Sequence, residues 1–286
     1  MEILGFVAAL LIGLSLGLIG GGGSILTVPV LVYLIGLSPV ISTAYSLFVV
    51  GLTSLVGSYN FYRKGLVSLK TAVVFGLPSI VAVYITRRYI VPAIPENIFS
   101  VGDFMVTKGV LLMLLFAGLM VFASISMIRK KKTAEPEAVA ADENADKEID
   151  LEHENPKAYH PKPKFNYAGI LAEGVIVGTL TGLVGAGGGF LIIPALVLFS
   201  KLDMKMAVGT SLLIIAVKSL FGFIGDIFNY DIDWTFLAIF SSISIAGIFV
   251  GSWLSTKIHA DKLKASFGWF VLLMGVYIII KEIFFA

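Results

Sequence analysis

The amino-acid sequence predicts an all-α membrane protein: a polytopic transmembrane helical bundle of two inverted repeats, each with a glycine-rich broken or re-entrant hairpin. Three observations lead to this prediction: an apolar composition, an internal duplication, and a glycine run that interrupts apolar sequence once in each half. Hydrophobic residues make up 57% of the chain and charged residues 14%, against roughly 45–50% and about 25% in soluble domains. A water-soluble domain could not bury so much apolar surface, so the composition favours a lipid bilayer.

The duplication is clearest around the glycine runs. The segment 17–31, GLIGGGGSILTVPVL, returns 165 positions later as 182–196, GLVGAGGGFLIIPAL, with eight of the fifteen aligned positions identical. The match continues without a gap as far as Gly57 and Gly222. The sequence therefore contains a long internal repeat.

Each half contains five apolar segments. They are 3–19, 25–37, 43–59, 67–85 and 105–128 in the first half, and 167–184, 190–199, 206–225, 234–256 and 265–280 in the second. The second segment of each half is too short to cross a bilayer core of about 30 Å at about 1.5 Å per residue. We therefore expect the first two segments of each half to form a hairpin with the glycine run at its tip, leaving open whether the short segment crosses or re-enters.

Parity and charge predict the orientation. A hairpin leaves parity unchanged, so each half has an odd number of crossings and the halves are inverted. With the loop at Arg63 and Lys64 in the cytoplasm, sixteen of the 21 Lys and Arg residues fall inside, as the positive-inside rule requires. This arrangement predicts a multi-pass protein of the cell (plasma) membrane with both termini outside and with Arg87 and Arg88 in an external loop.

The central stretch differs in kind from the rest of the chain. Its low hydrophobicity and dense charge predict a disordered linker. The expected organisation is a first transmembrane repeat at 1–128, a polar cytoplasmic linker at 129–166, and a second transmembrane repeat at 167–286.

The glycine runs suggest an anion site. Each run is expected to open a short helix whose unpaired N–H groups and positive dipole end point into the membrane. Two such ends, related by inversion, would meet near the midplane, where lipid offers no hydrogen-bond partner. The alternative is that small residues simply permit tight helix packing. A nucleotide-binding fingerprint is disfavoured, because no strand precedes the glycines and no Gly-Lys-Ser/Thr follows them.

The doubled glycine sequence, with Pro29 and Pro194 trailing it and AVGTSL at 207–212, resembles the TauE/SafE family of sulfite exporters, also called the TSUP family. The resemblance covers both membrane halves and omits the linker. It implies transport, usually export, of small sulfur oxyanions such as sulfite, thiosulfate and organosulfonates. Carried over by position, it implies that the glycine runs, Thr210 and Ser211 belong to the site. The first copy departs from the family at Tyr45, where threonine is favoured.

Hydroxyl groups near the glycine runs are further candidate donors for an oxyanion. They belong to Ser24, Thr27, Ser46, Thr53, Ser54, Thr210, Ser211 and Ser219, with Tyr45 in addition. The alternative for each is a bond to its own backbone or to a neighbouring helix.

Lys218 lies inside an apolar segment and is matched by Thr53 in the first half. Charges within a membrane are costly and usually functional, so Lys218 is expected to offset the charge of an anionic substrate. The alternatives are an ion pair with Glu173 or snorkelling toward an interface. A titrating Glu173 would instead couple transport to protons.

The sequence thus predicts a secondary transporter, an exporter, that binds a small sulfur-containing oxyanion at the midplane between the glycine-rich helix N-termini. The expected substrate-binding residues are Gly20, Gly21, Gly22, Gly23, Ser24, Tyr45, Ser46, Thr53, Gly185, Gly187, Gly188, Gly189, Thr210, Ser211 and Lys218. The alternatives are a carrier of another small anion, such as a carboxylate, and, less favoured, a non-transporting scaffold or an intramembrane enzyme.

Catalysis is not expected. The chain has no cysteine, which excludes disulfides, thiolate nucleophiles and cysteine-based metal sites. None of its three histidines lies in a membrane segment. No cofactor, metal or nucleic acid is expected, and the expected partners are the small anion, the lipid bilayer and coupled protons. The oligomeric state is not predicted.

Overall fold

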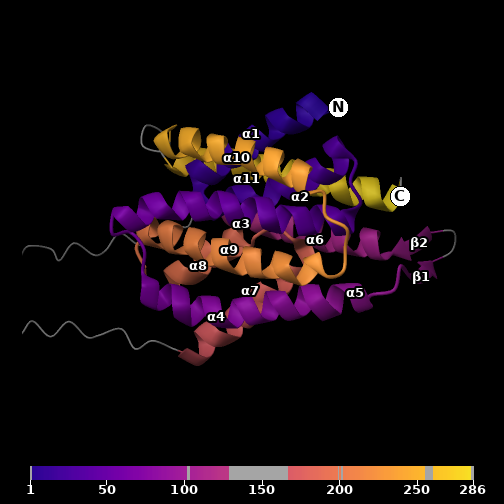
Figure 1. Ribbon diagram of the computed structural model, residues 1–286, viewed down its shortest axis with the longest axis horizontal. Helices are drawn as coiled ribbons and strands as arrows, with labels where there is room; N and C mark the ends of the chain where they lie inside the picture. The colour runs from indigo at the N-terminus through magenta and orange to yellow at the C-terminus, as the bar shows by residue number, and fades with distance from the viewer. Residues whose placement is uncertain are drawn as a thin grey trace, which may run out of the picture.

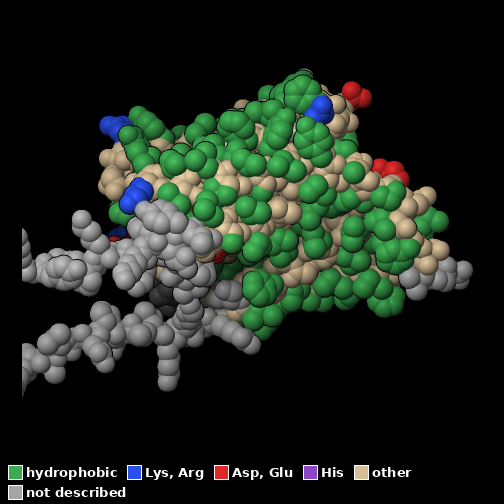
Figure 2. All heavy atoms as spheres, turned by 90° about the horizontal axis from the view of Figure 1, so that it is seen from below, with side chains coloured by type: hydrophobic (Ala, Val, Ile, Leu, Met, Phe, Trp, Pro, Cys, Tyr) green, Lys and Arg blue, Asp and Glu red, His purple; other side chains and the backbone are tan. Residues whose placement is uncertain are grey.

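The computed structural model describes residues 2–101, 104–128, 167–198, 200, 202–254 and 260–284. Within these ranges seven helices are long and apolar enough to cross a membrane, which confirms the predicted polytopic helical bundle. Hydrophobic side chains cover most of the face shown in Figure 2. An exterior of this kind suits lipid rather than water. The predicted linker at 129–166 lies outside the described residues.

The first half is a broken hairpin followed by longer helices (Figure 1). The hairpin consists of α1 (Glu2–Ile19), the 3₁₀ helix η1 (Gly20–Leu26), α2 (Thr27–Pro29) and the π-helix η2 (Val30–Ile35). After it come α3 (Pro39–Arg63), α4 (Leu69–Ile85), the π-helix η3 (Thr86–Ile90), α5 (Val91–Ala93) and α6 (Lys108–Ile128). The second half contains α7 (Tyr167–Val184), α8 (Gly189–Leu198), α9 (Met204–Ile227), α10 (Trp234–Leu254) and α11 (Ala260–Phe284).

A short antiparallel hairpin of β1 (Asn97–Val101) and β2 (Phe104–Thr107) precedes α6 and was not predicted. The expected helix at 105–128 was therefore wrong at its start, because β2 extends to Thr107 and α6 begins at Lys108. The residues of β2 include Phe, Val and Thr, which favour strands. A short apolar run cannot by its pattern alone distinguish a strand from a helix.

Both glycine hairpins return to the side from which they enter. In the first, a Cβ on Gly5 near the start of α1 would lie 2.0 Å from Cδ1 of Ile35, the last residue of η2. In the second, Ile170 near the start of α7 and Leu196 near the end of α8 belong to one hydrophobic cluster. The ten residues of α8 rise about 15 Å, roughly half of a bilayer core. In the first hairpin the short segment therefore runs back toward the start of α1, and α8 is too short to cross a bilayer core by itself.

The principal helix contacts join one half of the chain to the other. Helix α1 packs against α10 and, in exchange, α7 packs against α4. Helix α3 packs against α9, and α6 against α11. The pattern is unchanged when the two halves are exchanged, as a two-fold relation between inverted halves would produce. The halves therefore interleave and share one core.

Individual contacts follow the same 165-residue spacing. A Cβ on Gly20 would meet Val208, and a Cβ on Gly185 would meet Thr43, the residue 165 positions before Val208. Both glycines have a positive φ, +73° and +74°, which a residue with a Cβ rarely adopts. The duplication thus repeats tertiary contacts as well as sequence.

Tyr45 and Thr210 are matched positions, and each accepts a hydrogen bond from a backbone N–H just before a helix of the other half. The Tyr45 hydroxyl accepts a hydrogen bond from the backbone N–H of Asp233 at 2.7 Å. The Thr210 hydroxyl accepts one from the backbone N–H of Ser68 at 2.9 Å. Ser68 and Asp233 immediately precede α4 and α10. Each hydroxyl therefore anchors the start of a helix in the opposite half.

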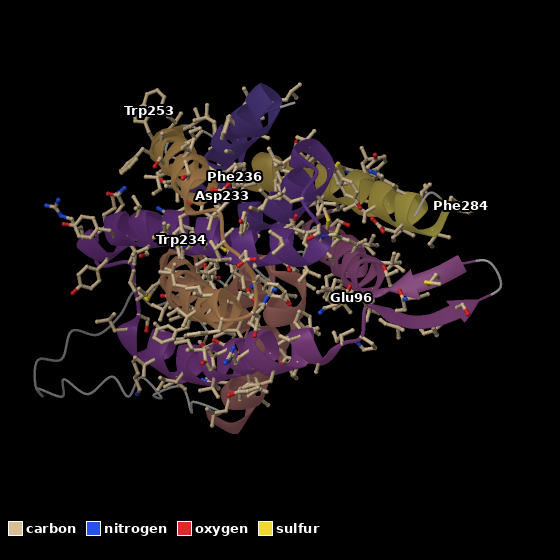
Figure 3. All side chains as sticks on the ribbon, turned by 45° about the vertical axis from the view of Figure 1, so that its right-hand side comes forward. Glu96, Asp233, Trp234, Phe236, Trp253 and Phe284 are labelled. Atoms are coloured by element: carbon tan, nitrogen blue, oxygen red, sulfur yellow. The ribbon has the colours of Figure 1, made fainter. Side chains whose placement is uncertain are left out.

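The anchored residues in turn cap their own helices. Asp233 Oδ1 accepts from the backbone N–H of Phe236 at 2.9 Å, and Ser68 Oγ accepts from that of Thr71 at 3.4 Å. The Tyr45 ring also stacks on Phe236, with centroids 5.8 Å apart. Figure 3 shows Asp233 and Phe236 together at the start of α10. Tyr45 thus keeps the same bond as its matched position, Thr210, through a longer side chain.

We expect Gly189→Ala to destabilise the fold strongly, because its Cβ would lie 2.3–2.4 Å from the Cα, O and C atoms of Gly21. Overpacking of this kind costs about 1–3 kcal/mol. Gly22→Ala is the matched control, since its Cβ would meet only the Ile19 side chain, at 3.1 Å. Thermal unfolding of the detergent-purified variants should show a lower Tm for Gly189→Ala alone. Equal melting temperatures would contradict the backbone contact.

We expect Tyr45→Phe and Thr210→Val each to lower the unfolding free energy by about 0.5–1.5 kcal/mol, the net worth of one hydrogen bond. Tyr45→Phe keeps the stacked ring and removes only the hydroxyl. Tyr62→Phe is the control, because the Tyr62 side chain is 57% exposed and should tolerate the loss. Chemical denaturation of the purified protein measures the differences, and a Tyr45→Phe variant as stable as Tyr62→Phe would refute the anchoring role.

Candidate functional site

The two glycine runs meet backbone to backbone in the interior of the bundle. Gly21 of η1 and Gly189 at the start of α8 leave no room for a Cβ on either residue. Ser24 Oγ donates to the carbonyl oxygens of Gly21 and Ala186 and so links the two runs. The residues of both runs are buried. The predicted meeting of the two turns is therefore present in the structure.

The two runs differ in local geometry. In the second half the chain turns over Gly185–Gly188 and α8 begins at Gly189, with the N–H groups of Leu191 and Ile192 donating to Gly188 O. In the first half the glycines themselves form the 3₁₀ helix η1. The first run thus begins a short helical segment, but as a 3₁₀ helix that contains the glycines and continues into α2 and η2. Only α8 directs an N-terminal turn at the crossing, because the second run has three residues at positive φ and the first has one.

Lys218 lies at the second turn. Its side chain is fully buried, and Nζ donates to Thr181 Oγ1 at 2.9 Å. A Cβ on Gly188 would lie 2.8 Å from Nζ, so the ammonium group is directly beside the glycine backbone. No carboxylate in the described part of the chain forms an ion pair with Lys218. The alternative pairing with Glu173 is therefore not formed.

Thr181 was not among the site residues predicted from the sequence. It lies in α7 four residues before Gly185, whose backbone N–H donates to Thr181 O at 2.7 Å. Its matched position in the first half is Leu16, so the duplication gives no sign of it. A threonine one helical turn before a glycine run was the available signal.

The remaining predicted residues divide into three groups. Thr53 and Ser211 donate to their own helices, at Val49 O and Val208 O. Tyr45 and Thr210 anchor helix starts away from the crossing, as described above. The hydroxyls of Thr27, Ser46, Ser54 and Ser219 are fully buried and have no hydrogen-bond partner among the described residues.

The unpartnered serines flank residues that touch the glycine runs. A Cβ on Gly187 would lie 2.7 Å from Val50 of α3 and 3.3 Å from Ile215 of α9. Ser46 and Ser54 stand four residues before and after Val50, and Ser219 stands four after Ile215. Residues four apart share a helix face, so these hydroxyls lie one turn from the contacts with the glycine run.

The site is closed in this conformation. The space beside Thr181 and Gly188, which Phe190 and Leu119 also line, is too tight to hold water. In this conformation, entry of a molecule beside Lys218 would therefore require a conformational change.

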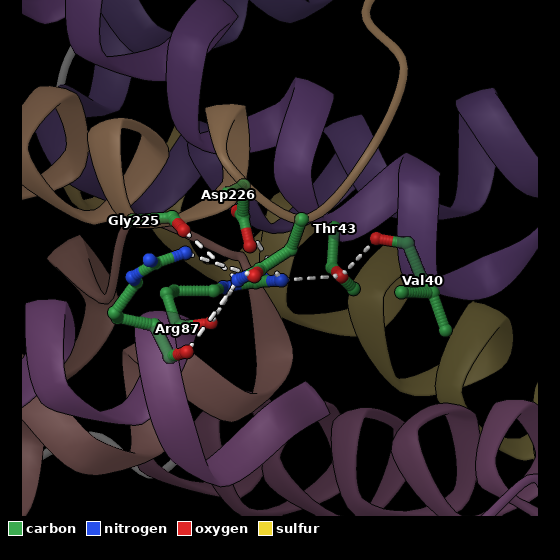
Figure 4. Close-up of polar contacts among 7 residues, drawn as sticks. Val40, Thr43, Arg87, Gly225 and Asp226 are labelled. Atoms are coloured by element: carbon green, nitrogen blue, oxygen red, sulfur yellow. Dashed lines mark hydrogen bonds and ion pairs between the residues drawn. The ribbon is translucent and has the colours of Figure 1, made fainter. Parts of the chain in front are cut away.

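A buried ion pair joins η3 to the last turn of α9. Figure 1 shows α5, which follows η3, toward the end of the bundle that holds both termini. Arg87 Nη1 lies 3.6 Å from Asp226 Oδ2, with both side chains fully buried, and it donates to Thr43 Oγ1 at 3.0 Å (Figure 4). The expectation that Arg87 lies in an external loop was wrong. The helix continues through η3 as a π-helix, with Val91 N–H donating to Thr86 O, and carries Arg87 into the protein. An arginine at the end of an apolar run gives no sequence signal of this burial.

The chain is similar to known membrane transporters. The family described as "Sulfite exporter TauE/SafE" matches residues 5–278. A "Probable membrane transporter protein" of Xylella fastidiosa (strain Temecula1) is 31% identical over 277 residues, covering 94% of this chain and 91% of that protein. The "Probable membrane transporter protein YunE" of Bacillus subtilis (strain 168) is 24% identical over 294 residues, covering 98% and 99%. No solved structure matches the chain. With a match across both membrane halves, the chain belongs to the TauE/SafE family of membrane transporters.

Proposed function

We propose that this transporter is a secondary carrier, working as an exporter, of a small sulfur-containing oxyanion such as sulfite, thiosulfate or an organosulfonate. The anion binds where the glycine runs cross, against Lys218, Thr181 and the N-terminal turn of α8. The "Sulfite exporter" description of the family supports the substrate class.

The observation that carries this proposal is the burial of Lys218 without a carboxylate. A cation in a low-dielectric interior is costly unless an opposite charge accompanies it. Among the described residues only Thr181, a neutral hydroxyl, bonds to Nζ. A bound anion supplies the missing charge, and the α8 N-terminus adds the positive end of a helix dipole.

Three further donors suit an oxyanion. The hydroxyls of Ser46, Ser54 and Ser219 are buried and unpartnered, and a buried hydroxyl without a partner is unfavourable. An anion with several oxygen atoms accepts from such donors after a modest rearrangement of α3 and α9. A carboxylate carrier remains the alternative, because two oxygen atoms would also bridge Lys218 and a hydroxyl.

The same proposal includes the orientation of the protein. Residues 1–128 and 167–286 act as two inverted repeats in the cell membrane, whose relative movement exposes the crossing to each side in turn. The 129–166 linker and the basic turn between α3 and α4 lie in the cytoplasm, and both termini lie outside. Glu173, with a buried and unpartnered Oε2, is the candidate for proton coupling.

We expect sulfite, thiosulfate or sulfoacetate to raise the Tm of the purified protein, because a ligand that binds only the folded state stabilises it. Lys218→Met should weaken this binding by about 10- to 100-fold, as loss of a charged hydrogen bond of about 1.5–3 kcal/mol implies. Lys205→Met on the same helix is the control, since Lys205 is exposed. The variants are compared by titration calorimetry and by sulfite flux in proteoliposomes.

The outcomes separate the alternatives. Stabilisation by acetate and other carboxylates alone would move the proposal to a carboxylate carrier. Absence of binding by every anion would contradict the carrier role of the crossing. Wild-type affinity in Lys218→Met would remove the lysine from the site.

We expect Ser54→Ala and Ser219→Ala to raise the Tm of the ligand-free protein and to weaken sulfite binding. Removing an unpartnered buried hydroxyl relieves an unfavourable burial of about 1–3 kcal/mol, whereas a hydroxyl that binds the anion is missed when the anion arrives. Ser211→Ala is the control, because Ser211 already bonds to Val208 O. A gain in Tm with unchanged affinity would mean that these serines are packing residues alone.

A further inference from the structure

Three buried charged residues do not follow the two-fold repetition of the fold. Lys218, Arg87 and Asp226 are all fully buried. Their matched positions in the duplication are Thr53, Ser252 and Phe61, which carry no charge. The two symmetry-related ends of the bundle therefore differ in chemistry, and the Arg87–Asp226 pair has no counterpart at the opposite end. Because the other half of the duplication folds without these charges, we expect the Arg87–Asp226 pair to have a role other than stabilising the fold.

The ion pair is poorly satisfied. Its N–O distance is 3.6 Å, longer than the roughly 2.7–2.9 Å of a charge-assisted hydrogen bond. Within the part of the chain that the structure describes, Nε and Nη2 of Arg87 have no hydrogen-bond partner, and neither has either carboxylate oxygen of Asp226. A buried pair with unfilled donors and acceptors contributes little to stability.

The unused edge of Arg87 matches an oxyanion. Nη1 is engaged by Thr43 and Asp226, which leaves the Nε and Nη2 donors side by side. This edge of a guanidinium group binds two oxygen atoms of one anion in a bidentate way, as lysine cannot. The arginine lies in the π-helix η3, and π-helical turns are frequent at functional sites.

The pair is connected to the glycine crossing. Thr43, which accepts from Arg87 Nη1, lies against Gly185 at the second turn, where a Cβ would meet its O, Cα and Cβ atoms. Asp226 and Lys218 are eight residues apart on α9, about 12 Å along the helix axis. Two buried cations thus lie along α9, Arg87 beside Asp226 and Lys218 at the glycine crossing.

We propose that Arg87 forms a second oxyanion subsite, connected through Thr43 to the glycine crossing, and that Asp226 occupies the guanidinium group when no anion is bound. The subsite takes anions with two oxygen atoms on one centre, such as sulfite or a sulfonate. This proposal rests on the proposed anion transport. The incoming anion displaces Asp226 and then passes between Arg87 and Lys218 during the transport cycle.

The test compares Arg87→Lys, Asp226→Asn and Arg88→Gln with the wild type by calorimetric titration of sulfite into the full-length purified protein. Arg88→Gln is the matched control, because Arg88 is adjacent in η3 and bonds instead to Asn229. We expect Arg87→Lys to weaken sulfite binding at least tenfold, since it keeps the charge and loses the bidentate edge. Asp226→Asn should tighten binding severalfold, because the competing carboxylate is gone. Arg88→Gln should bind as the wild type does.

A charge-reversed double variant, Arg87→Asp with Asp226→Arg, tests for a purely structural pair. Such a pair would be restored by the reversal, and sulfite binding would return to the wild-type value. The subsite predicts that binding stays at least tenfold weaker even if the Tm recovers. Asp226→Asn with unchanged or weaker binding, or Arg87→Lys equal to Arg88→Gln, would also overturn it. If the wild type binds neither sulfite nor a sulfonate, the proposed function fails; if Lys218→Met alone weakens binding, only the Arg87 subsite fails.

Discussion

The architecture depends on one contact: two glycine backbones touching in the interior of an apolar bundle. Gly21 and Gly189 approach so closely that neither position admits a Cβ. This contact brings two re-entrant segments together at the middle of the protein. Non-helical backbone at membrane depth is tolerated only where protein surrounds it or where it lines a cavity. The close crossing thus permits chain turns inside the bundle and concentrates backbone polar groups at one place.

The duplication supplies a symmetric frame, and individual substitutions within it supply the chemistry. Tyr45 and Thr210 show the frame: two different side chains place a hydroxyl oxygen on the equivalent backbone N–H. Lys218 and Thr53, which are matched positions, show how one substitution changes the chemistry. The Thr53 hydroxyl donates to Val49 O in its own helix, whereas Lys218 Nζ donates to Thr181 in another helix, α7. Symmetry thus preserves backbone anchors and permits unlike groups where a substrate would bind.

The sequence could predict what is repeated or local. Apolar runs gave the helices, and the doubled glycine segment gave the two hairpins that meet at Gly21 and Gly189. It could not predict contacts between residues far apart in the chain. Thr210 looked like a substrate ligand because the family motif contains it, yet its partner is Ser68, 142 positions away. Arg87 was expected in an external loop, and only the continuation of the helix through η3 shows that it meets Asp226.

The closed conformation holds more buried positive charge than its partners satisfy. Lys218 bonds to the hydroxyl of Thr181 instead of to a carboxylate. Arg87 has a carboxylate partner, Asp226, but the distance of 3.6 Å between Nη1 and Oδ2 is too long for a charge-assisted hydrogen bond. A ligand shifts a conformational equilibrium only to the extent that it binds one state better than another. In an open conformation water would solvate Lys218 and Arg87, whereas in the closed conformation it does not. An anion therefore binds these cations more strongly in the closed conformation, which gives the required difference in affinity. An anion bound beside Lys218 and Arg87, as proposed above, would therefore stabilise the closed conformation more than an open one.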